Sequence, residues 1–131
     1  MPVRALSTAL IVLVGLLNLL PVSGVLSSTR LQALYGIVLQ DANVIILMRH
    51  RAVLFGVVGG LLVISAFHPP VRPVGYAVGF VSMLSFVLIA WLAGGYNPEL
   101  RRVLVVDLVA SAALLGALLL DHLAVAGETP A

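Results

Sequence analysis

The sequence predicts an all-α integral membrane protein, a four-helix bundle with a short interfacial helix between its first and second spans. Three observations carry this prediction. The 131 residues are 62% hydrophobic and only 9% charged, whereas soluble domains have about 25% charged residues. The apolar residues gather in four runs, each close to the roughly 20 residues that cross a bilayer. Short polar turns separate the runs, so residues 1–131 form a single transmembrane domain.

The first span is expected at about residues 5–22, where only Ser7, Thr8 and Asn18 interrupt an apolar run. The basic residue before this run and Val22-Ser23-Gly24 after it are also typical of a cleaved signal peptide. We expect the span to be retained, and cleavage stays open as the alternative.

A short amphipathic helix is expected at about residues 28–39. Ser27-Ser28-Thr29 offers an N-cap, and Leu31, Leu34, Tyr35 and Val38 then recur at helical spacing. The segment is too short to span a bilayer. It is therefore expected to lie in the membrane interface, with Tyr35 at the level of the lipid headgroups.

The second span, at about residues 44–67, holds the unusual sequence Arg49-His50-Arg51 about two turns inside its start. Charge at that depth is costly unless it is paired, hydrated or near the headgroups. Ala52, Gly56 and Gly60 recur every four residues and indicate a helix-packing face. Arg49 is expected on this face, whereas Arg51 is about 200° away and is expected to reach the headgroups.

The third and fourth spans are expected at about residues 74–93 and 103–123. Gly75 and Gly79 give the third span a second small-residue face for helix packing. Asn97 before Pro98 is a typical helix start. Asp107 lies about one turn inside the fourth span, where an unpaired carboxylate would be costly.

Most of the intramembrane polarity is expected in one layer, at the end of the bundle that carries the first and third loops. Asn18, Arg49, His50, Arg51 and Asp107 all fall there, which makes them the predicted ligand-binding residues. Five of the seven basic residues also lie at this end, so the positive-inside rule puts loops 1 and 3 in the cytoplasm.

The layer has two interpretations. In the first, Asp107 and Arg49 form a structural pair. In the second, Arg49 and Arg51 hold an anionic or polar head, Asp107 orients Arg49, and Asn18 and His50 complete the pocket. The function predicted is therefore a non-enzymatic structural or accessory protein, or a binder of a lipid or another small amphiphile. The alternatives are a membrane enzyme acting on a lipid or quinone, with His50 or Asp107 as acid/base, and a small transporter subunit.

Other chemistry has little support in the sequence. The chain has no cysteine, which excludes thiol catalysis and cysteine-ligated metal. Its arginines are scattered beside apolar spans, which is not a nucleic-acid signature. His68 and His122 lie at the opposite end from His50 and are poor haem ligands. We expect no metal and no cofactor. The expected partners are membrane lipid or a small amphiphile, a second copy of the chain or another membrane protein.

Two blocks of residues carry a family resemblance. Tyr35-Gly36, Asp41, Asn43 and residues 47–56 form the first block, and Gly94-Gly95-Tyr96-Asn97, Arg101-Arg102 and Asp107 form the second. Together they resemble small uncharacterised four-span proteins of bacteria that are loosely similar to DoxX-like proteins. The resemblance covers most of the chain and implies a four-helix fold in the bacterial inner membrane, with no known activity. Some such sequences carry the label phosphopantetheine adenylyltransferase, a soluble α/β enzyme whose His-x-Gly-His signature this chain lacks.

Overall fold

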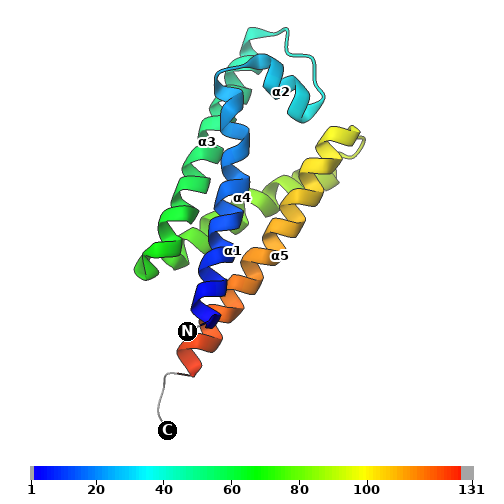
Figure 1. Ribbon diagram of the computed structural model, residues 1–131. Helices are drawn as coiled ribbons and strands as arrows, with labels where there is room; N and C mark the ends of the chain where they lie inside the picture. The colour runs from blue at the N-terminus through cyan, green and yellow to red at the C-terminus, as the bar shows by residue number, and fades with distance from the viewer. Residues whose placement is uncertain (1, 128–131) are drawn as a thin grey trace.

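The computed structural model describes residues 2–127, and this part of the chain is helical without strands (Figure 1). The elements are α1 (Pro2–Leu19), the 3-10 helix η1 (Leu20–Val25), α2 (Ser28–Tyr35), α3 (Ala42–Phe67), the 3-10 helix η2 (Pro69–Val71), α4 (Arg72–Ala93) and α5 (Pro98–Ala126). Four segments are long and apolar enough to cross a membrane: Pro2–Val25, Ala42–Phe67, Pro69–Ala93 and Pro98–Ala126. The chain is a multi-pass membrane protein with an all-α bundle fold, as the sequence predicts.

The four long helices close around a common core. α1 packs against α3 and α5, and α4 packs against the same two helices, so α1 and α4 lie diagonally across the bundle. The core is formed by small and aliphatic side chains, among them Ile11, Val14, Leu62, Met83 and Leu114. Large apolar side chains on the outer faces stay exposed, including Leu88 at 54% and Val109 at 62%. An outer surface this apolar suits contact with lipid rather than with water.

Two glycines, Gly15 of α1 and Gly59 of α3, let the backbones of these helices approach closely. A Cβ atom on Gly59 would lie 2.7 Å from the carbonyl oxygen of Gly15, and one on Gly15 would lie 3.0 Å from that of Gly59. The packing face predicted for α3, formed by Ala52, Gly56 and Gly60, was therefore partly wrong. Ala52 is buried, but a Cβ on Gly60 would meet nothing within 4 Å. The predicted role of Gly75 and Gly79 is confirmed, because both are buried and a Cβ on either would press on a neighbouring helix.

The turns follow local sequence signals. Asp41 caps α3, since its carboxylate accepts a hydrogen bond of 2.8 Å from the backbone N–H of Asn43. Asn97 caps α5 in the same way through the backbone N–H of Leu100, with Pro98 at the first helical position. The Asn97 cap starts α5 where the sequence indicates, and the Asp41 cap starts α3 at Ala42, two residues before the expected start of the second span.

The short helix α2 differs from its prediction in length and in surroundings. It ends at Tyr35, because Gly36 adopts φ +62° and terminates the helix in the left-handed conformation. Tyr35 is only 3% exposed, so its ring packs inside the protein rather than against lipid headgroups. With Leu31 and Leu39 it forms a second apolar cluster that packs against Leu100 and Val103 of α5. α2 thus covers the end of the bundle opposite to the end where α1 begins and α5 finishes (Figure 1).

Candidate functional site

The densest polar network lies at the end where α1 begins and α5 finishes, and Arg72 is its centre. This side chain starts α4 and is 13% exposed. All five of its N–H donors have partners in the other long helices. These are Ser65 O (3.3 Å) for Nε, Ser7 Oγ (3.1 Å) and Asp121 Oδ1 (2.7 Å) for Nη1, and Thr8 Oγ1 (2.7 Å) and Ala66 O (2.7 Å) for Nη2.

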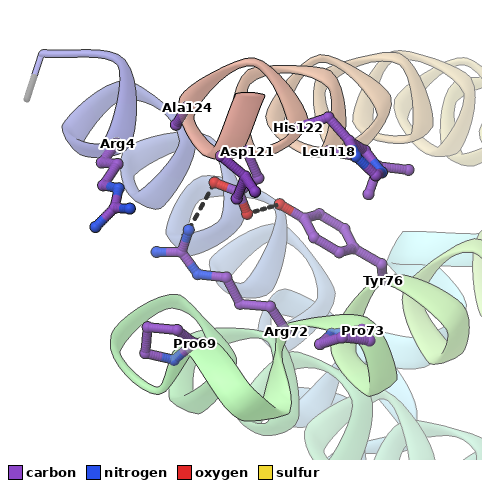
Figure 2. Close-up of a pocket in the computed structure, with 10 residues that line it drawn as sticks. Arg4, Pro69, Arg72, Pro73, Tyr76, Leu118, Asp121, His122 and Ala124 are labelled. Atoms are coloured by element: carbon purple, nitrogen blue, oxygen red, sulfur yellow. Dashed lines mark hydrogen bonds and ion pairs between the residues drawn. The ribbon is translucent and has the colours of Figure 1, made fainter. Parts of the chain in front are cut away.

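Asp121 of α5 completes this network. Its Oδ1 accepts hydrogen bonds from Arg72 and from the hydroxyl of Ser7, and its Oδ2 accepts one of 2.7 Å from the hydroxyl of Tyr76 (Figure 2). α1, α3, α4 and α5 therefore meet in one set of charge-assisted hydrogen bonds, which we call the four-helix polar cluster. Bonds of this kind are about twice as strong as neutral ones.

A pocket of about 620 Å³ opens beside the polar cluster, and we call it the end pocket (Figure 2). Its walls are mostly apolar and come from the start of α4 and the end of α5: Pro69, Pro73, Leu118, Ala124 and Val125. Arg4 and His122 add polar groups to its lining. Its volume falls within the roughly 300–1,000 Å³ that is typical of small-molecule sites.

Near the other end of the bundle, Arg51 lies in a groove of about 260 Å³ between α3 and α4. We call it the Arg51 groove. The guanidinium carbon is 4.9 Å from the ring centroid of Phe86, 5.0 Å from that of Phe55 and 5.7 Å from that of Tyr35. Distances below about 6 Å are typical of cation–π contacts. Tyr35 comes from α2, so three separate helices supply the rings.

Asp107 and Asn18, the other two polar residues predicted for this layer, are buried. Asp107 is 8% exposed, and its Oδ2 has no hydrogen-bond partner among the described residues. Arg51 is the cation that acts on it electrostatically, without an ion pair. Asn18 is 5% exposed. Its side-chain amide donates a hydrogen bond of 2.9 Å to the carbonyl of Val14 and a longer one, of 3.8 Å, to the sulfur of Met83.

The structure corrects the predicted pair between Arg49 and Asp107. Arg49 is exposed and donates a hydrogen bond of 3.4 Å to Ser28 Oγ, and no ion pair joins it to Asp107 within residues 2–127. The reason lies in the buried face of α3, where Ala52, Phe55, Gly59 and Leu62 recur at helical spacing. Arg51 lies one turn above Phe55 on this face, whereas Arg49 lies about 120° from Phe55.

The five predicted site residues are thus divided between two places. Asp107 and Asn18 are buried and Arg51 is half-buried, whereas Arg49 and His50 are exposed. The four-helix polar cluster was missed, although its signal was present. Ser7 and Thr8 begin the first span, Arg72 begins the third, and Asp121 ends the fourth, so a four-span topology puts all of them at one end.

Neither a search for metal-ligating side chains nor comparison with known proteins assigns a function to these sites. Within residues 2–127, no three His, Cys, Asp or Glu side chains are grouped closely enough to hold a metal ion. Comparison with protein-family models, with curated proteins and with solved structures finds no match. The argument for function therefore rests on the geometry of the sites.

Proposed function

We propose that this membrane protein is a non-enzymatic binder of a lipid or other small amphiphile, and that the end pocket is its binding site. The observation that carries the proposal is the pocket itself, about 620 Å³ of mostly apolar lining beside a preorganised polar cluster. An amphiphile needs both surfaces: apolar walls for its chain and polar groups for its head.

The polar cluster supports binding rather than catalysis. Arg72 uses all five N–H donors within the protein, and both oxygens of Asp121 accept hydrogen bonds. Groups saturated in this way have little left to offer a substrate. They hold the four helices at the spacing that keeps the pocket open. The polar head then meets the outer part of the pocket, where Arg4 and His122 contribute to the lining.

The proposed location is the bacterial inner membrane, with loops 1 and 3 in the cytoplasm. Arg30, Arg49, Arg101 and Arg102 are exposed at the α2 end. At the opposite end the exposed arginine is Arg4, while Arg72 is paired inside the bundle. Exposed positive charge sets orientation, so the end pocket would face the outer leaflet. Kinship with small four-span bacterial proteins, loosely DoxX-like, is part of the proposal and rests on the sequence resemblance alone.

Two neighbouring tryptophan substitutions test the proposal. Val125 is 63% exposed and lines the end pocket, whereas Leu123 is 66% exposed and does not. Val125→Trp should fill the pocket without disturbing the core, and Leu123→Trp adds the same bulk on another face of the helix. The proposal expects native mass spectrometry of membrane extracts to find an amphiphile on the parent and on Leu123→Trp, and much less on Val125→Trp. Equal occupancy of both variants would reject it.

A further inference from the structure

The Arg51 groove has a polar end and an apolar length. α3 supplies Arg51, Leu54 and Val58 to one wall, and α4 supplies Ser82, Ser85 and Ile89 to the other. The two helices run antiparallel, so Arg51 and Ile89 lie nearer the α2 end, and Val58 and Ser82 lie deeper. An acyl chain that follows the groove inward from Arg51 would meet mostly aliphatic side chains.

Arg51 has unused binding capacity. Its Nε is buried without a hydrogen-bond partner, and no carboxylate of residues 2–127 forms an ion pair with it. Asp107 and Arg51 affect each other electrostatically, but they are too far apart to form an ion pair. The three aromatic rings fix its position and offer attraction that is weak beside a charge-assisted hydrogen bond. An anion is the partner that this guanidinium lacks.

The depth of Arg51 matches a lipid headgroup. It follows Ala42, where α3 starts, by nine residues, which is about 14 Å of helix. Helical side chains point toward the N-terminus, and a long arginine reaches farther still. The 26 residues of α3 extend about 39 Å, close to the roughly 40–45 Å of a bilayer with its headgroups. The guanidinium therefore lies near the boundary between hydrocarbon and headgroups.

We propose that the Arg51 groove binds an anionic phospholipid, with the phosphate on Arg51 and one acyl chain along Leu54, Val58 and Ile89. The site is independent of the end pocket and lies at the opposite end of the bundle. A lipid is the occupant because the groove lies on the membrane-facing side of α3 and α4 and because its one strong charge is positive.

The test compares two arginines of the same helix. Arg49 is exposed and two residues away, which makes Arg49→Gln the matched control for Arg51→Gln. Both are made in the Val125→Trp background, so that the end pocket does not contribute. Delipidated protein is titrated with palmitoyl-oleoyl phosphatidylglycerol, or with the phosphatidylcholine of the same chains, and bound lipid is counted by native mass spectrometry.

We expect Arg51→Gln to weaken phosphatidylglycerol binding about tenfold or more, the usual loss for a hydrogen bond to a charged group. Arg49→Gln should bind as its parent does, and phosphatidylcholine should bind the parent more weakly than phosphatidylglycerol. Equal losses in the two arginine variants, or no preference for phosphatidylglycerol, would overturn the proposal.

A second pair of variants keeps the test valid if Arg51→Gln folds poorly. Ser85→Trp fills the groove from an exposed position and leaves the arginine intact, whereas Leu88→Trp adds the same bulk at an exposed position outside the groove. The proposal requires Ser85→Trp to lose bound phosphatidylglycerol and Leu88→Trp to keep it. Retention by Ser85→Trp would refute the groove as the site, even if the proposed function of the end pocket stands.

Discussion

Replacing Asp121 by alanine is the sharpest test of the four-helix polar cluster. The change removes three accepted hydrogen bonds, from Arg72, Tyr76 and Ser7. It also leaves the guanidinium of Arg72, only 13% exposed, without a counter-charge. Breaking one partner of a buried ion pair costs about 3–5 kcal/mol. We expect about 3 kcal/mol here, at the low end, because Arg72 keeps four other hydrogen bonds and Asp121 is 20% exposed.

The assay is the free energy of unfolding in mixed micelles, measured by titration with a denaturing detergent. A double-mutant cycle with Arg72→Met should show a coupling of about 1–3 kcal/mol, because each change removes the partner of the other. Tyr76→Phe is the graded control, since it removes a single hydrogen bond worth about 1 kcal/mol. The cluster does not hold the helices together if the unfolding free energy of Asp121→Ala lies within about 0.5 kcal/mol of the parent's, or if the effects of the two changes are additive.

Three further predictions follow from the packing, the caps and the topology. Gly59→Ala should destabilise the bundle by about 1–3 kcal/mol in the same titration, because its Cβ would press on the backbone of Gly15. Gly60→Ala should be neutral or up to about 1 kcal/mol stabilising, since that site is open, and a loss equal to that of Gly59→Ala would contradict the packing. Asn97→Ala should cost about 1–2 kcal/mol or more, because it removes the cap on Leu100 and the hydrogen bonds of the amide to Tyr35 and Gly36, and an unchanged unfolding free energy would count against both roles. Alkaline phosphatase fused at either end of the chain should be active, and green fluorescent protein at either end dark. The reverse pattern at either end would reject the proposed orientation.

The fold was predictable because its signals are local. Four apolar runs give the spans, and Asp41, Asn97 and Pro98 mark helix starts through chemistry within three residues. The predicted boundaries were wrong where a helix extends beyond its apolar run. The fourth span was expected to begin near residue 103, yet α5 begins at Pro98, because Arg101 and Arg102 continue the helix after the apolar run has ended.

The sites were harder to predict because they depend on which helix faces meet. The choice between Arg49 and Arg51 rests on the contact of Gly59 with Gly15, 44 residues away in the sequence. A stripe of small residues at a spacing of four was visible, but it does not say which of its members touches a neighbour. Arg72 and Asp121 are likewise 49 residues apart, and no local pattern joins them.

The seating of α2 has a consequence for the loop between α4 and α5. The side-chain amide of Asn97 donates to the carbonyls of Tyr35 (2.8 Å) and Gly36 (3.2 Å), and Leu100 packs on the same cluster. These partners lie at the start of α5, whereas α2 precedes three of the four long helices in the sequence. The hydrogen bonds from Asn97 to the end of α2 therefore need α5 in place, whereas the contacts of α2 with η1 do not. Asn97 thus joins the start of α5 to the segment that carries Tyr35, whose ring contacts Arg51 of α3, so one amide links the third loop to the Arg51 groove.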